Sequence, residues 1–142
     1  MNAILLDTSV VSLLHPKKKQ TDLRTQYAAH LAGKIPALSF QSVAELWAWA
    51  EHNGWGQQAK SQLDAFIQGF LVIPYNYTLA KIWGESSALC SQQGRTLGAG
   101  DIWIAATAVQ YRMPLLTHDR DFVGVEIPHL DVISYIGQGK AG

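Results

Sequence analysis

Short apolar segments alternate with longer amphipathic stretches along the chain. Segments that are apolar on both sides are typical of strands in a parallel sheet that helices cover on both faces; they lie at residues 3–6, 37–40, 70–75, 114–117 and 131–134. The stretches between them predict helices over residues 10–15, 21–33, 42–56, 57–69, 78–94 and 101–112. We expect Pro114 to close the last helix, since a proline disfavours helical geometry in the residue before it. The alternation predicts a doubly wound α/β domain.

Length and composition limit the architecture to one domain. A chain of 142 residues, 48% hydrophobic and 15% charged, is long enough for one core and too short for two. We expect this domain to span residues 1–136 and the glycine-rich residues 137–142 to form a flexible tail. The single cysteine excludes an internal disulfide, and the chain lacks both a signal-peptide pattern and an apolar run long enough for a membrane span. The expectation is a soluble, cytoplasmic protein.

The charge balance restricts how the chain contacts a polyanion. Eleven basic and eleven acidic residues give a formal net charge of zero, so nucleic-acid binding has to rely on local patches. The lysine run at 15–19 is one candidate, although such loops are usually only solvated. Three arginines that flank acidic motifs are better candidates: Arg95, Arg112 and Arg120.

Four acidic residues are expected at one edge of the sheet, where α/β proteins bind their ligands. Asp7 follows the first strand directly, and Asp119 follows the fourth. Asp101 opens a helix that leads into the fourth strand, and Glu45 is expected in the first turn of the helix after residues 37–40. The carboxyl ends of parallel strands share one edge, so these carboxylates should meet.

Each acid also has a structural explanation. Asp7 fits an Asx turn or a helix N-cap, and Glu45 fits a capping box with Ser42 as the N-cap. Asp101 suits the positive end of a helix dipole, and Asp119 suits a loop. Four independent caps have no reason to share one edge, however, and crowded carboxylates require a cation to neutralise them. Oxygen ligands without a companion cysteine indicate Mg²⁺ or Mn²⁺.

Four motifs together resemble the PIN-domain ribonucleases, and most closely the VapC toxins of bacterial toxin–antitoxin pairs. They are LLDTSV, SVAEL, GDIWIAATAV and LLTHDRDF, in this order along nearly the whole chain. The resemblance implies a PIN-like fold, with a central twisted parallel sheet flanked by helices on both faces. It also implies a catalytic quartet of Asp7, Glu45, Asp101 and Asp119, in which the fourth position is the loosest match and Asp121 competes for it.

The activity implied by the resemblance is metal-dependent endoribonuclease cleavage of RNA, which leaves 5′-phosphate and 3′-hydroxyl ends. Asp7 and Asp101 would ligate Mg²⁺ or Mn²⁺ directly. Glu45 and Asp119 would bind a second ion, act through water or orient the attacking water. The implied partner is a small DNA-binding, VapB-like antitoxin, and homodimers are common in the family; the apolar helices at 21–33 and 42–55 offer surfaces for that contact.

Two other functions stay open from the sequence. A phosphatase of the haloacid dehalogenase type requires a DxDxT motif after the first strand, but here the sequence is DTSVV and position 9 is a serine. A catalytically silent binding partner would lack at least one core acid, and the three firmest matches are all present. Cleavage of RNA that EDTA abolishes and Mg²⁺ or Mn²⁺ restores would distinguish a metal-dependent nuclease from both.

Overall fold

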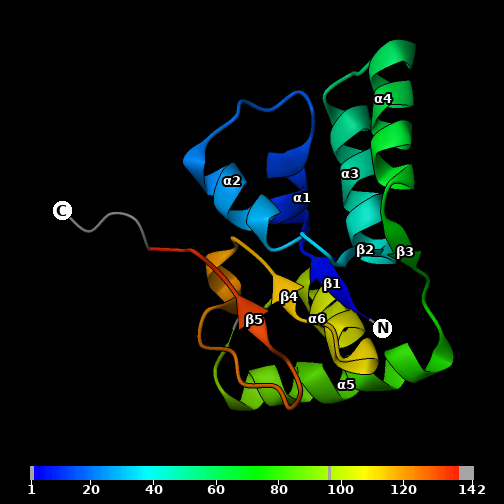
Figure 1. The fold of residues 1–142 in the computed structure, drawn as a ribbon. Helices are drawn as coiled ribbons and strands as arrows, with labels where there is room; N and C mark the ends of the chain where they lie inside the picture. The colour runs from blue at the N-terminus through cyan, green and yellow to red at the C-terminus, as the bar shows by residue number, and fades with distance from the viewer. Residues whose placement is uncertain (1, 96, 138–142) are drawn as a thin grey trace.

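The structure is a computed structural model, and it describes residues 2–95 and 97–137. Within this part, five parallel strands form one sheet in the order β3-β2-β1-β4-β5 (Figure 1). The strands are β1 (Ala3–Leu6), β2 (Ile35–Ser39), β3 (Leu71–Ile73), β4 (Leu115–Leu116) and β5 (Val132–Ile133). The helices are α1 (Thr8–Leu14), α2 (Asp22–Ala29), α3 (Phe40–His52), α4 (Gln57–Gln68), α5 (Tyr77–Gln92), α6 (Ala99–Tyr111) and the 3₁₀ helix η1 (Arg120–Phe122).

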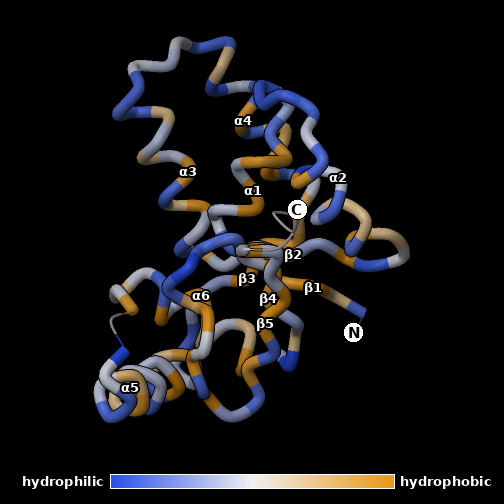
Figure 2. Tube along the Cα trace, turned by 90° about the vertical axis from the view of Figure 1, so that its left-hand side faces the viewer, coloured by the Kyte–Doolittle hydropathy of each residue, from blue (hydrophilic) through white to orange (hydrophobic). Residues whose placement is uncertain are grey.

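Helices cover both faces of the sheet, as the apolar strands predict. Successive side chains of a strand point to opposite faces, so Ile4 and Leu6 belong to one core while Ala3 and Leu5 belong to the other. Helices α1 to α4 pack over the first core, and α5 and α6 pack over the second. Figure 2 shows the apolar strands between these two groups of helices. The prediction of a parallel α/β fold with helices on both faces is confirmed.

The strand order creates a switch point beside β1. The chain adds β2 and then β3 on one side of β1, and places β4 and then β5 on its other side. The connections that leave β1 and β4 therefore diverge, and the carboxyl ends of these two neighbours border a crevice, which is where open α/β sheets bind ligands. Leu6 pairs with Leu116 in the sheet, so the residues that follow them, Asp7 and Thr117, emerge side by side.

Helix α3 begins earlier than its apolar pattern suggests. Phe40 was expected to end a strand, but it is the first residue of α3 and is 52% exposed. Ser39 is the N-cap, and its hydroxyl accepts a hydrogen bond from the Ser42 amide at 3.1 Å. Ser42 is therefore inside the helix, and the capping box of Ser42 and Glu45 is wrong. Glu45 lies in the second turn of α3 rather than the first.

Helix α6 ends before the proline effect can act. Its last residue is Tyr111, and Arg112 closes it in the left-handed conformation, with φ of 53°. The predicted end at residue 112 is one residue late, and the left-handed Arg112 rather than Pro114 closes the helix. Of the predicted tail at 137–142, residues 138–142 lie outside the described part of the chain. None of the described helices is both long and apolar enough to span a bilayer.

Candidate metal and catalytic site

Asp7 occupies the N-cap position of α1, yet its side chain makes no capping hydrogen bond. Its main-chain oxygen accepts hydrogen bonds from the amides of Val10 and Val11 instead. The carboxylate is buried, and its Oδ2 accepts hydrogen bonds from Ser9 Oγ at 2.7 Å and Thr117 Oγ1 at 2.8 Å. Burial raises the pKa of Asp7, and these two hydrogen bonds oppose the rise. The helix-cap interpretation of the Asp7 side chain is therefore wrong.

Residues after β4 continue the same hydrogen-bonded network. Thr117 Oγ1 accepts a hydrogen bond from the Asp119 amide at 3.0 Å, and Ser9 Oγ accepts one from the His118 amide at 3.0 Å. Asp119 in turn caps η1, because its Oδ1 accepts a hydrogen bond from the Asp121 amide at 2.9 Å. The hydroxyl groups of Ser9 and Thr117 thus fix the strand end on which Asp119 stands.

Glu45 extends from α3, and two polar neighbours hold its carboxylate. Thr8 Oγ1 donates to Glu45 Oε1 at 2.6 Å, and Gln41 Nε2 donates to Glu45 Oε2 at 2.8 Å. The Tyr75 hydroxyl donates to Gln41 Oε1 at 3.2 Å. The roles of Gln41 and Tyr75 were missed from the sequence, because the loop after β3 has to fold over α3 before they meet.

Asp101 lies in the first turn of α6, whose N-cap is Gly98. No hydrogen bond among the described residues makes the Asp101 side chain a cap. The preceding glycine leaves room for two side-chain ends of α3, because a Cβ at Gly100 would lie 2.7 Å from Gln41 Nε2 and 3.1 Å from Glu45 Oε2 and would displace them. The glycine before Asp101 therefore lets α3 and its carboxylate approach the N-terminus of α6.

The negative charges of the other acids act on Asp101. Its pKa is raised to about 7, first by burial and then by the negative charges of Asp119, Asp7, Glu45 and Asp121. Every other candidate acid from the sequence, Asp121 included, thus raises the pKa of the Asp101 carboxyl. This influence on Asp101 is what we expect of carboxylates that lie at one edge of the sheet.

Three carboxylates are close enough to share a cation. Among the residues that the structure describes, Asp101, Asp119 and Asp121 each offer an oxygen, and these oxygens lie within 4.8 Å of one another. Asp7 and Glu45 lie outside this trio. The donors are all carboxylate oxygens, so the set fits a hard divalent cation such as Mg²⁺ or Mn²⁺. The trio brings Asp121, the competitor for the fourth position, next to Asp119.

The arginines flanking the acidic motifs are placed differently from one another. The Arg95 guanidinium donates to the main-chain oxygens of residues 123–124, which gives it a structural role. Arg112 lies at the opposite end of α6 from Asp101, about 16 Å along the helix axis. Arg120 is exposed on η1, beside the acid trio in sequence. Of the three, only Arg120 stays a candidate for contact with a substrate at this edge.

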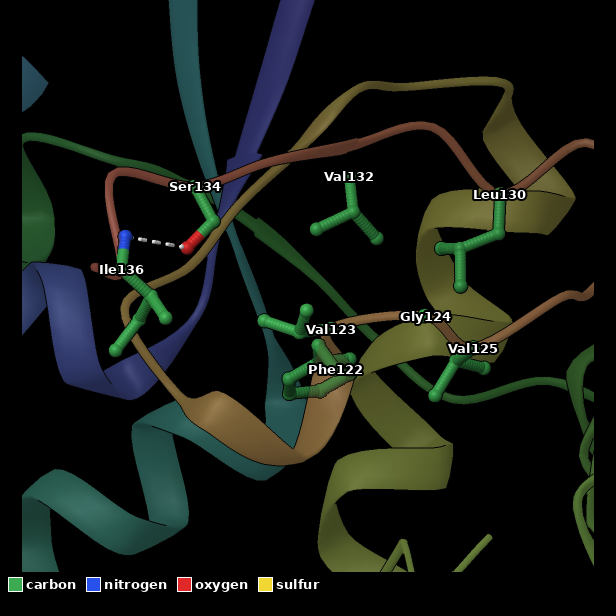
Figure 3. Close-up of a pocket in the computed structure, with 8 residues that line it drawn as sticks. All are labelled: Phe122, Val123, Gly124, Val125, Leu130, Val132, Ser134 and Ile136. Carbon is green, nitrogen blue, oxygen red and sulfur yellow. Dashed lines mark hydrogen bonds between the residues drawn. The ribbon is translucent and has the colours of Figure 1, made fainter. Parts of the chain in front are cut away.

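A separate pocket lies beside β5, and none of the site acids lines it. Figure 3 shows its lining, which comes from residues 122–125 and from alternate residues of 130–136, around a volume of about 320 Å³. Its one polar side chain is Ser134, whose hydroxyl accepts a hydrogen bond from the Ile136 amide at 3.2 Å. This pocket holds no titratable side chain, so it offers neither an acid, a base nor a charged ligand.

Comparison with known proteins gives the same family as the acidic motifs. The PIN domain model matches residues 4–127. Ribonuclease VapC2 of Haemophilus influenzae is 28% identical over 119 residues, which cover 83% of this chain and 88% of that protein.

Solved structures share the fold. The complex of VapBC2 from Rickettsia felis with a DNA fragment from its promoter has a TM-score of 0.78 and 23% identity, over 93% of this chain and 98% of that one. DNA-bound VapBC from Salmonella typhimurium has a TM-score of 0.74 and 22% identity, over 95% of this chain and 99% of that one. The chain therefore belongs to the PIN domain family and is a homologue of the VapC ribonucleases.

Proposed function

We propose that this protein is an endoribonuclease that depends on Mg²⁺ or Mn²⁺ and acts as the toxin of a VapBC-like toxin–antitoxin pair. The observation that carries the proposal is the convergence of Asp7, Glu45, Asp119 and Asp121 on Asp101 at the switch point of the sheet. A structural role accounts poorly for this cluster, because neither the Asp7 nor the Asp101 side chain makes a helix-capping hydrogen bond. Its homology to Ribonuclease VapC2 supports the same chemistry.

The acids are suited to hold one or two cations. Asp7 and Asp101 are proposed as direct ligands, and the proximity of the carboxylate trio supports a share in the ligation for Asp119 and Asp121. A bound divalent cation supplies Lewis-acid chemistry, because it lowers the pKa of water and neutralises the charge that grows on the scissile phosphate. The proposed reaction is in-line hydrolysis of an RNA phosphodiester, which leaves a 5′-phosphate and a 3′-hydroxyl.

The remaining residues orient these ligands. Ser9 and Thr117 both donate to Asp7 Oδ2, so the carboxylate is held in one orientation. Thr8 and Gln41 each hold one oxygen of Glu45, which is proposed to orient the attacking water or a second cation. Hydrogen-bonded neighbours of this kind fix ligand geometry and strongly affect metal affinity.

The proposed partners are RNA as substrate and a small DNA-binding antitoxin of the VapB type. The solved structures that share this fold are VapBC proteins bound to DNA, which supports an antitoxin of this type. We further propose a homodimer, with the helices at 21–33 and 42–55 as candidate surfaces.

Induced expression in a bacterial host tests the toxin role. Wild-type protein is expected to arrest growth, and co-expression of the small open reading frame next to its gene is expected to restore it. Asp7→Asn should abolish the arrest, because an amide keeps the shape of the side chain and loses the charge. A matched control is Asp64→Asn, which removes an exposed charge from α4. An Asp7→Asn variant that arrests growth at wild-type abundance would refute the proposed ligand role.

A further inference from the structure

A second pocket opens beside the acidic site, between α1 and α3. Its volume is about 290 Å³, near the lower end of the ~300–1,000 Å³ typical of small-molecule sites. Glu45, a proposed site residue, forms part of its wall. The rest of the lining combines hydroxyl, apolar, aromatic and cationic side chains: Thr8, Ser12, Leu46, Trp49 and Lys18. The pocket thus adjoins the acidic site through Glu45, and Lys18 places one positive charge in its lining.

The loop that supplies Lys18 is anchored against α3 by a buried histidine. His15 is fully buried, and its ring contacts those of Trp49, Trp55 and Phe66. Its Nδ1 accepts a hydrogen bond from the Lys17 amide at 3.0 Å, which fixes the start of the lysine run. Burial lowers the pKa of His15, with smaller contributions from nearby cations, so the ring is neutral at pH 7. The loop is therefore held in place by packing rather than by charge.

The lysine side chains lie along the aromatic surface of this anchor. Lys17 Nζ is 4.1 Å from the centre of a Trp55 ring, and Lys18 Nζ is 5.3 Å from that of Trp49. Such cation–π contacts hold an ammonium group near a ring without neutralising it. Lys18 is consequently kept at the rim of the pocket with its charge available to a ligand.

In the part of the chain that the structure describes, the cations around the pocket form no salt bridge, and Glu45 is the one carboxylate in the pocket lining. The salt bridge found among the described residues joins Lys60 to Glu51 and includes no residue of the lysine run. Arg24 adds to this positive charge, since its guanidinium donates to the main-chain oxygens of Lys18 and Leu14. We call Lys17, Lys18 and Arg24 together the basic patch. In a chain of zero net charge, this local excess of cations adjoins a cluster of carboxylates that repels phosphate. The patch complements a polyanion that has to approach those carboxylates.

We propose that the pocket between α1 and α3 binds one nucleotide of single-stranded RNA next to the scissile bond. Lys18 contacts a backbone phosphate, and Trp49 forms the apolar wall against which the ribose or base packs. Glu45 lies on the side of the pocket that faces the cleavage site. Stacking on an aromatic side chain and contact with a lysine are the usual means of holding single-stranded nucleic acid. This inference rests on the proposed ribonuclease function, and it names the surface that guides the strand.

A pair of lysine variants tests the pocket. Lys18→Gln and Lys19→Gln each remove one positive charge from the same exposed loop, but only Lys18 lines the pocket. Binding of a fluorescein-labelled, single-stranded oligoribonucleotide is measured by anisotropy in EDTA, so that no cleavage occurs, at a series of salt concentrations. Lys18→Gln is expected to weaken binding about tenfold at low salt and to reduce the salt slope by about 0.7. Lys19→Gln should stay within about twofold of wild type.

Metal-dependent RNA cleavage by the wild-type protein is measured alongside. It distinguishes a wrong pocket assignment from a wrong ribonuclease function. If wild type cleaves RNA but the two lysine variants bind it equally, the pocket assignment is wrong and the ribonuclease function stands. The pocket assignment is also wrong if Lys18→Gln loses only its affinity for a protein partner, because the pocket then belongs to that partner. If wild type neither binds nor cleaves RNA, both proposals are refuted.

Discussion

Replacement of Asp101 by asparagine should stabilise the metal-free protein at neutral pH. The wild-type carboxylate is partly buried among four other acids, and its pKa is raised from 3.8 to about 7. The folded state therefore holds a proton more tightly than the unfolded state does. Stability is greatest below the unfolded pKa and falls as the pH rises through the window from about 4 to about 7. Asparagine has no charge to lose, so the variant escapes this fall.

The size of the effect follows from the shift. A rise of about 3 pKa units corresponds to an upper limit of about 4 kcal/mol, at 1.36 kcal/mol per unit. Asp101 is only partly buried, and solvent screening reduces the figure, so we expect about 2 kcal/mol in the free energy of unfolding at pH 7. For a chain of this size, that difference raises the melting temperature by about 5–8 °C. Near pH 4 the two proteins should melt together.

Thermal melts in EDTA at pH 4 and pH 7 measure this difference directly. Asp64→Asn is the matched control, because it removes an exposed charge outside the site and should leave the melting temperature almost unchanged. Addition of millimolar Mn²⁺ should stabilise wild type strongly and Asp101→Asn weakly, since a ligand stabilises the state that binds it. An Asp101→Asn variant that is less stable than wild type in EDTA and gains equally from Mn²⁺ would refute the reasoning and return Asp101 to a purely structural role.

Three further substitutions probe the geometry of the site. Asp119→Asn should slow RNA cleavage more than Asp121→Asn, because Asp119 is half-buried at the end of β4 whereas Asp121 is exposed; equal initial rates for the two variants would reassign the fourth acid. Gly100→Ala should displace the Gln41 amide from Glu45 and lower the cleavage rate by roughly ten- to hundredfold. Its melting temperature should not fall, since alanine favours the helix; an unaffected rate would show that this contact is dispensable.

The strands were predictable from their short apolar runs. The location of the main acids was predictable because the carboxyl ends of parallel strands share one edge of the sheet. Asp7 directly follows β1, and the segment at 114–117 contains β4, so the sequence placed two carboxylates at strand ends. The strand order was not predictable, because adjacency of β1 and β4 depends on tertiary packing that no local pattern encodes. That adjacency is what lets Thr117 reach Asp7.

The main error in the predicted strand and helix boundaries arose where an apolar residue is exposed. Phe40 continues an apolar run in the sequence but is 52% exposed, so the pattern extended a strand into the first turn of α3. The error moved the expected cap from Ser39 to Ser42 and placed Glu45 one turn too early. The proximity of Asp121 to Asp101 was likewise beyond the sequence, because it depends on the turn that η1 makes after Asp119.

Cleavage of single-stranded RNA by purified protein, with and without chelation, tests the central claim most directly. The measurement follows the appearance of product and the chemistry of its new ends. The proposed metal site predicts that EDTA abolishes cleavage by the wild-type protein, that excess Mg²⁺ or Mn²⁺ restores it with 5′-phosphate and 3′-hydroxyl ends, and that Asp7→Asn stays inactive in both. Cleavage that survives EDTA, or that Asp7→Asn retains at the wild-type rate, would contradict the proposed metal site.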